Sequence, residues 1–176
     1  MTTSARSDIT CVVVMGPSGV GKTTTAEGLA ERMGWIFAEA DTFHPKANID
    51  KMTAGIPLND DDRAPWLALI RDWISDKARA GASTVVTCSA LKRRYRDVLR
   101  GADARVRFLE LMGEVDTIQG RMASRKGHYM PPSLLASQFA DLEPLGADED
   151  GVIVDVSVSP EEVISTGVEK LGLTRS

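Results

Sequence analysis

The chain has 176 residues, of which 43% are hydrophobic and 26% charged, a balance typical of one soluble domain with a buried core. Its formal net charge of −4 argues against a large nucleic-acid-binding face. No apolar run approaches the roughly 18 residues that a membrane-spanning helix needs, so no such helix is expected.

The N-terminal residues 1–9 are polar and lack the apolar stretch of a signal peptide. We therefore expect a loose tail, followed by a single domain over residues 10–173. Cys11 and Cys88 both lie in apolar runs, which favours buried free thiols and a reducing compartment. These features predict a cytoplasmic protein that binds neither nucleic acid nor membrane.

A phosphate-binding pattern follows the first predicted strand, which covers residues 10–15. Residues 16–23 read Gly-Pro-Ser-Gly-Val-Gly-Lys-Thr and match G-x-x-x-x-G-K-[ST], and apolar residues at helical spacing then predict a helix over 22–33. Strand, glycine loop and helix N-terminus together direct backbone N–H groups at a polyphosphate. The alternative is a glycine-rich turn without a ligand. The expected nucleotide-binding residues are Gly16, Pro17, Ser18, Gly19, Val20, Gly21, Lys22, Thr23 and Thr24, with Lys22 on the terminal phosphates and Thr23 on Mg²⁺.

Strand-like and helix-like segments alternate along the rest of the chain. Further strands are predicted at 35–39, 84–88, 105–111 and 151–156, and helices at 46–53, 64–80, 91–100, 114–124, 132–141 and 160–171. This alternation indicates parallel strands with crossover helices on both faces. The expected fold is α/β: a three-layer α/β/α P-loop NTPase fold with a five-stranded parallel sheet and a small lid. Its ligands should bind beyond the carboxyl ends of the strands.

An acidic residue, Asp41, follows the second predicted strand. The third strand ends at Cys88 without the acid that many P-loop ATPases use to hold Mg²⁺, and the chain has no Asn-Lys-x-Asp guanine-reading motif. Both absences argue against a motor ATPase or a GTPase switch. Asp41 is therefore the candidate to take the proton of an attacking hydroxyl, orient it, or complete the shell of the metal. The alternative is that Asp41 caps a helix starting near Pro45.

Three polar residues follow Asp41 in the next predicted helix region. His44 precedes Pro45, and the spacing leaves open whether His44 contacts a substrate or is a structural cap. Asn48 and Lys51 share one face of the short helix at i and i+3, which by default is a solvated face.

Three adjacent carboxylates at residues 60–62 precede Arg63. Their spacing fits no EF-hand loop, so we expect them to cap a helix beginning near Pro65 and to stabilise its dipole. The guanidinium of Arg63 can bind a carboxylate through two hydrogen bonds, although a structural salt bridge is an equal alternative.

A basic segment lies between the predicted helices 114–124 and 132–141. Four potential cations fall within eight residues, namely Arg121, Arg125, Lys126 and His128. We expect a lid at about residues 121–137 that places positive charge on a transferring phosphoryl group and excludes water. A solvated basic loop is the alternative.

Several segments resemble the bacterial gluconate kinases of the thermoresistant gluconokinase type, within the shikimate- and adenylate-kinase-like P-loop group. They are residues 15–23, 41–52, 55–63, 65–66, 88–92, 95–96, 125–128, 138–139 and 142–143, so the resemblance extends over about residues 10–170. His-Pro-x-x-Asn-x-x-Lys-Met at 44–52 and Pro-Leu-Asn-Asp-Asp-Asp-Arg at 57–63 are more specific than the P-loop. Ala40 departs from the glycine that this family often has there, and residues 88–91 lack the glycine triplet of shikimate kinases.

The resemblance implies transfer of a phosphoryl group from ATP to the 6-hydroxyl of D-gluconate, with Mg²⁺ as cofactor and usually by a homodimer. On this basis the expected catalytic residues are Lys22, Asp41, Arg63 and Arg125, the metal residues are Thr23 and Asp41, and Arg121 joins the nucleotide site. The expected substrate contacts are Asp41, His44, Asn48, Lys51, Arg63, Lys92 and His128. Alternatives are a kinase for another small hydroxy acid such as shikimate or for a nucleoside monophosphate, or a nucleotide-dependent regulator.

Overall fold

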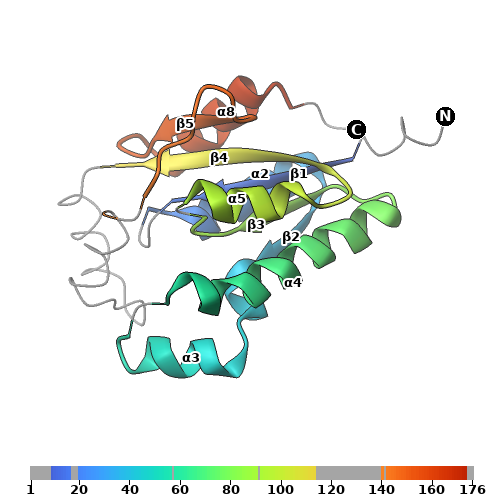
Figure 1. The fold of residues 1–176 in the computed structure, drawn as a ribbon. Helices are drawn as coiled ribbons and strands as arrows, with labels where there is room; N and C mark the ends of the chain where they lie inside the picture. The colour runs from blue at the N-terminus through green and yellow to red at the C-terminus, as the bar shows by residue number, and fades with distance from the viewer. Residues whose placement is uncertain are drawn as a thin grey trace.

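A parallel five-stranded sheet forms the centre of the protein. The computed structural model describes residues 9–16, 20–56, 58–90, 92–113, 140 and 142–173. Its strands are β1 (Thr10–Met15), β2 (Ile36–Glu39), β3 (Thr84–Thr87), β4 (Arg105–Met112) and β5 (Gly151–Asp155), in the order β2-β3-β1-β4-β5. Every pair of neighbouring strands is parallel, so the carboxyl ends of the strands meet at one edge, on the left in Figure 1.

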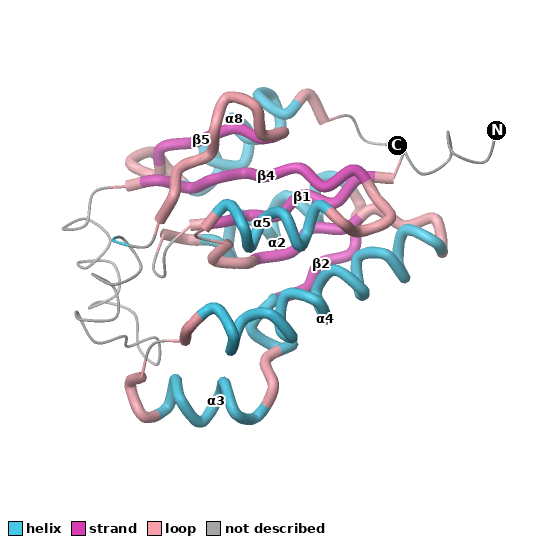
Figure 2. Tube along the Cα trace, viewed as in Figure 1, coloured by secondary structure: helices cyan, strands magenta, loops and turns pink. Residues whose placement is uncertain are grey.

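Helices cover both faces of this sheet, which gives the three predicted layers. The elements are α2 (Lys22–Met33), the 3-10 turn η1 (Ala40–Phe43), α3 (Lys46–Thr53), α4 (Asp60–Arg79), α5 (Arg93–Arg100) and α8 (Pro160–Leu171). Helices α2 and α8 pack on one face, and α4 and α5 on the other. Helix α3 lies away from the sheet, beside the N-terminal part of α4 (Figure 2). The N-termini of α4 and α5 lie at the same edge as the carboxyl ends of the strands (Figure 1).

The central strand β1 is buried on both sides, as its apolar sequence predicts. Val12 and Val14 pack toward α2 and α8, whereas Cys11 and Val13 pack toward α4 and α5. Cys11 and Cys88 are buried free thiols. Burial raises the pKa of each thiol to about 12, because a thiolate there would lose its hydration.

The start of α4 differs from the prediction. The helix begins at Asp60 and not near Pro65, because Asn59 and Asp62 form a capping box: the Asn59 side chain accepts from the Asp62 N–H at 2.8 Å, and the Asp62 carboxylate accepts from the Asn59 N–H at 2.9 Å. The acidic residues therefore occupy the first turn of the helix, where they favour its dipole. Pro65 lies inside the helix.

The remaining predicted elements agree with the structure within about two residues wherever it describes them. The predicted tail at 1–9 and the predicted helices at 114–124 and 132–141 lie almost wholly outside the described residues.

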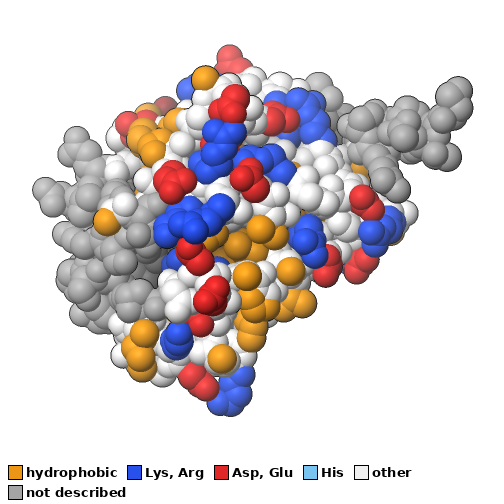
Figure 3. Space-filling view, in the orientation of Figure 1, with side chains coloured by type: hydrophobic (Ala, Val, Ile, Leu, Met, Phe, Trp, Pro, Cys, Tyr) orange, Lys and Arg blue, Asp and Glu red, His pale blue; other side chains and the backbone are white. Residues whose placement is uncertain are grey.

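Charged side chains on the face that carries α4 and α5 lie beside partners of opposite sign (Figure 3). Arg79 pairs with Asp103 at 2.8 Å, and Arg105 pairs with Asp150 at 3.0 Å. Exposed pairs of this kind contribute little to stability. In the part of the chain that the structure describes, no helix has the length and apolarity needed to cross a membrane.

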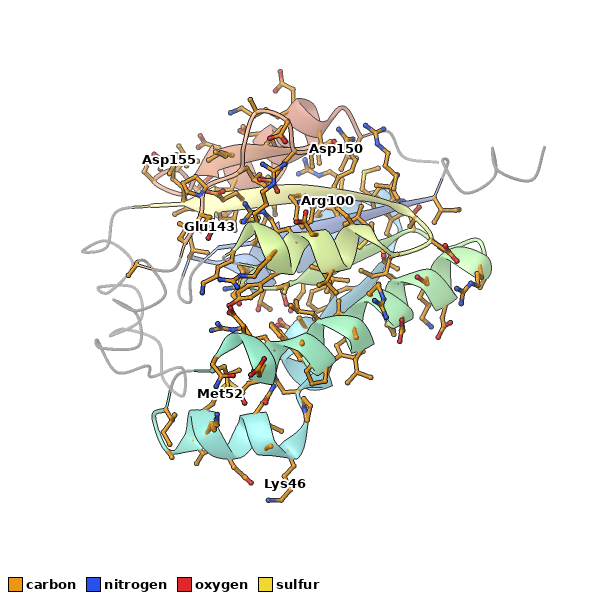
Figure 4. All side chains as sticks on the ribbon, viewed as in Figure 1. Lys46, Met52, Arg100, Glu143, Asp150 and Asp155 are labelled. Atoms are coloured by element: carbon orange, nitrogen blue, oxygen red, sulfur yellow. The ribbon has the colours of Figure 1, made fainter. Side chains whose placement is uncertain are left out.

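A buried ion pair ties the segment before β5 to α5. Arg96 is fully buried, and its Nε and Nη2 donate to the two Glu149 carboxylate oxygens at 2.8 and 2.9 Å. Arg100 adds a third bond at 2.9 Å, and Figure 4, which labels Arg100 and Glu143, shows this segment lying against α5. Burial alone would raise the pKa of Glu149, but hydrogen bonds from Arg96, the Gly146 N–H and Arg100 outweigh it and lower the pKa to about 2.

Candidate active site

The candidate phosphate loop lies at the end of β1. Gly16 has a φ of +142°, and a Cβ there would lie 2.7 Å from the Leu111 carbonyl oxygen, so only glycine fits. Gly21, with a φ of +95°, is the N-cap of α2. The loop therefore ends at a helix N-terminus, whose N–H groups and dipole favour an anion. Pro17, Ser18 and Gly19 lie outside the described residues.

Lys22 begins α2 and folds back over the loop. Its Nζ donates to the Gly16 carbonyl at 2.9 Å. Burial lowers the pKa of Lys22, while the negative charges of Asp41 and Glu39 act in the opposite direction. A phosphate beside Lys22 would add to this negative charge and favour the ammonium form. Val20 of the loop is buried, whereas Thr24 in the first turn of α2 is exposed.

Glu39 is a site residue to which the sequence assigned no role. It is the last residue of β2 and lies opposite Thr87 of β3. The Thr23 hydroxyl donates to one of its carboxylate oxygens at 2.5 Å, and the Thr87 hydroxyl donates to the other at 2.9 Å. Glu39, and not Asp41, is therefore the acid in contact with Thr23. The sequence did show an acid at the carboxyl end of a predicted strand. Its contacts with Thr23 and Thr87 became evident only when the structure placed β2 beside β3.

The oxygen atoms at this point fit a hard cation. Thr23 and Glu39 present a hydroxyl and a carboxylate, which Mg²⁺ prefers as ligands. Within the described ranges, no group of three or more His, Cys, Asp or Glu side chains gathers around a point. A Mg²⁺ ion held here would have few protein ligands and would rely on phosphate oxygens and water, as Mg²⁺ in nucleotide sites commonly does.

Asp41 lies in η1, two residues beyond Glu39. Its side chain is 86% exposed, and its Oδ1 is 3.9 Å from Nε2 of His44. Helix α3 has Pro45 as its N-cap and no side-chain cap bond, so the alternative reading of Asp41 as a helix cap is wrong. Asp41 instead places a negative charge close enough to Lys22 and His44 to favour their protonated forms. Its exposed carboxylate can accept a proton from a bound hydroxyl.

The position of the His44 ring is fixed by two contacts. It stacks on Trp66 at a centroid distance of 4.2 Å and an angle of 13°. Asn48 Nδ2 lies 3.1 Å from His44 Nδ1 and also donates to the Asp62 carbonyl at 2.9 Å, which fixes the orientation of the amide. Since Nδ1 must then accept, the hydrogen sits on Nε2, on the side of Asp41. Burial and, to a smaller extent, Arg63 lower the pKa of His44, against the opposing effect of Asp41.

Asn48 and Lys51 connect α3 to the start of α4. Asn48 is 3% exposed, so the default expectation of a solvated face is wrong for this residue. Lys51 forms an ion pair at 2.7 Å with Asp62, which also belongs to the capping box of α4. The two side chains that the resemblance assigned to the substrate thus connect α3 to α4.

Arg63 faces α5 across the same edge. Its Nη1 donates to the Tyr95 hydroxyl at 2.9 Å, and this hydroxyl donates in turn to Asp60. Lys92, the residue before α5, places its Nζ 3.5 Å from Asp60. Among the described residues Arg63 has no carboxylate at salt-bridge distance, so the structural salt bridge considered from sequence is not what the structure shows.

The predicted lid residues Arg121, Arg125, Lys126 and His128 lie outside the described residues. The described site therefore contains two parts at one edge of the sheet. One is the phosphate loop with Lys22, Thr23 and Glu39. The other is the group of polar side chains on η1, α3, α4 and α5, with Asp41 on the side of the phosphate loop.

Gluconokinases and a sugar kinase are among the known proteins that this chain resembles in sequence and fold. The family described as "AAA domain" matches residues 11–145. A gluconokinase of Gluconobacter oxydans is 50% identical over 153 residues, which cover 87% of this chain and 86% of that protein. A sugar kinase from Janibacter sp. HTCC2649 superposes with a TM-score of 0.91 at 51% identity, covering 95% of this chain and 96% of that one. A gluconokinase from Sinorhizobium meliloti 1021 superposes with a TM-score of 0.85 at 42% identity, covering 95% and 94%. The chain belongs to the gluconokinase family of P-loop kinases.

Proposed function

We propose that this protein transfers the γ-phosphoryl group of ATP to the 6-hydroxyl of D-gluconate. The observation that carries the proposal is the convergence of two sites at one edge of the sheet: a phosphate loop with Lys22, and a cationic group containing Arg63 and Lys92. Membership of the gluconokinase family supports the assignment of donor and acceptor.

On the donor side, the residues bind and orient the triphosphate. The N–H groups at the start of α2 and the Lys22 ammonium bind the β- and γ-phosphates. Bound at Thr23 and Glu39, Mg²⁺ would neutralise charge on the phosphate oxygens. Phosphoryl transfer depends mainly on such positioning and charge, since the protein forms no covalent bond to the group.

On the acceptor side, Asp41 orients the attacking hydroxyl and takes its proton. His44 lies beside this carboxylate, with its Nε2 3.9 Å from the Asp41 Oδ1. The carboxylate of the acceptor binds to Arg63 and Lys92, the two cations that lie over the Tyr95 ring. Asn48 and Lys51 shape this side through their contacts with α4.

The wider assignments extend the same proposal. Mg²⁺ is the metal, Arg121, Arg125 and His128 belong to a lid over the bound substrates, and the enzyme works as a homodimer in the cytoplasm. Support comes from the resemblance to gluconate kinases, and for Mg²⁺ also from the oxygen ligands of Thr23 and Glu39.

An acceptor panel tests the function. Purified protein with ATP and Mg²⁺ is assayed against D-gluconate, shikimate, other sugar acids and AMP, with ADP release as the readout. We expect gluconate to raise ADP release far above the rate without acceptor, and the product to carry phosphate on O6. ADP release that does not depend on any acceptor would support a nucleotide-dependent regulator instead.

A further inference from the structure

Tyr95 joins two cationic side chains that come from different helices. It lies in the first turn of α5 and is 3% exposed. The Arg63 guanidinium carbon is 5.2 Å from the centroid of the Tyr95 ring, and Lys92 Nζ is 5.8 Å from the same centroid. Both distances fall in the range of cation–π attraction. The ring therefore holds Arg63 of α4 near Lys92 at the start of α5.

Asp60 offsets the repulsion between these cations. Its carboxylate accepts from the Tyr95 hydroxyl and lies 3.5 Å from Lys92 Nζ, and Arg94 Nη1 is 2.7 Å from its second oxygen. The Tyr95 hydroxyl is thus engaged twice, as donor to Asp60 and as acceptor from Arg63 at 2.9 Å. The single hydrogen of this phenol is therefore already donated within the protein.

We propose that Tyr95 and Asp60 are positioning residues for the acceptor. They hold the Arg63 guanidinium and the Lys92 ammonium at a fixed spacing, and this spacing gives the enzyme its preference for a polyol that carries a carboxylate. The inference rests on the proposed function, because it takes Arg63 and Lys92 as the groups that bind the acceptor carboxylate.

The physical reason is preorganisation. Arg and Lys have long side chains, and ordering them only when the substrate arrives would reduce affinity. Burial raises the pKa of Tyr95, so the phenol keeps the proton that it donates, and the hydrogen bond from Tyr95 is the main cause that lowers the pKa of Asp60. At neutral pH Tyr95 therefore stays neutral and Asp60 stays negatively charged.

The test removes the hydroxyl alone. Tyr95→Phe retains the ring under Arg63 but not the hydrogen bonds to Arg63 and Asp60. We expect the KM for D-gluconate to rise roughly tenfold, the scale of one hydrogen bond to a charged group, while kcat and the KM for ATP change less than about twofold. In an Arg63→Ala background the same change should raise the KM for D-gluconate less than it does in the wild type, because one of the two cations that Tyr95 positions is then absent. Equal effects on both substrates, or additive effects in the double variant, would overturn the positioning role.

A second pair of variants covers Asp60. Asp60→Asn should also raise the KM for gluconate, whereas Asp61→Asn, at the exposed neighbouring position, should leave it unchanged. Thermal melting of each variant checks that it is folded. If wild-type protein neither binds gluconate by calorimetry nor phosphorylates it, the proposed function fails and this inference with it. If wild-type protein does so and Tyr95→Phe and Asp60→Asn match it, only the inference fails.

Discussion

Replacing Glu39 tests the donor side of the site most directly. Glu39→Gln keeps the shape of the side chain but removes its charge, and it leaves a single carbonyl oxygen where two oxygens now accept from Thr23 and Thr87. Hydrogen bonds to charged groups contribute about 1.5–3 kcal/mol each, and loss of one such contact corresponds to about 10–150-fold in an equilibrium. Glu39 also orients the Thr23 hydroxyl, and substituting residues that orient metal ligands costs about 10–100-fold in metal affinity or activity. We therefore expect the Mg²⁺ concentration for half-maximal rate to rise by about 10–100-fold.

The assay is the initial rate of gluconate phosphorylation across a Mg²⁺ titration at fixed ATP. Glu31→Gln is the matched control, since Glu31 is an exposed residue of α2 and makes the same change of charge away from the loop. The KM for gluconate should remain close to the wild-type value in both variants. A Glu39→Gln enzyme with wild-type Mg²⁺ dependence and an unchanged melting temperature would refute the assignment of Glu39 to the metal.

Three further predictions concern catalysis, stability and pH. Lys22→Ala should lower kcat by at least ~100-fold without unfolding the protein, because it removes a preorganised charge from the phosphates; near-normal turnover would exclude Lys22 from the mechanism. Glu149→Ala should cost about 3–5 kcal/mol in urea unfolding, since it removes the carboxylate that pairs with the buried Arg96 guanidinium, and a loss below about 1 kcal/mol would contradict this. Burial lowers the pKa of His44 in the folded state. As the pH falls below about 6.5, the unfolded chain therefore takes up the proton before the folded protein does, and the free energy of unfolding decreases. Between about pH 7.5 and 5.5 the melting temperature of His44→Gln should therefore fall less than that of the wild type, and equal falls would argue against a buried neutral ring.

The sequence was sufficient for the features that depend on local patterns. The P-loop octapeptide between an apolar run and an amphipathic segment predicts a strand, a loop and a helix, and the structure confirms β1 and α2 at the predicted residues. Alternation of strands and helices is enough to predict a parallel sheet covered on both faces, because crossover connections require it. The position of Asp41 after β2 follows from the same reading, whereas Arg63 lies inside α4, which begins at Asp60 and not near Pro65 as predicted.

Contacts between segments far apart in the chain required the tertiary structure. Local patterns do not encode which strands are neighbours, and only the order β2-β3-β1 places the Glu39 carboxylate between Thr23 and Thr87. The hydrogen bond from Arg63 to Tyr95 joins α4 to α5 through two residues that are 32 positions apart in the chain. No local sequence pattern around either residue predicts this contact. Residue spacing therefore indicated a nucleotide site at this edge, and the resemblance to gluconate kinases implied a small acid beside it. Packing of the helices decided which side chains hold the charges in place, because a hydrogen bond depends on distances that only the folded chain sets.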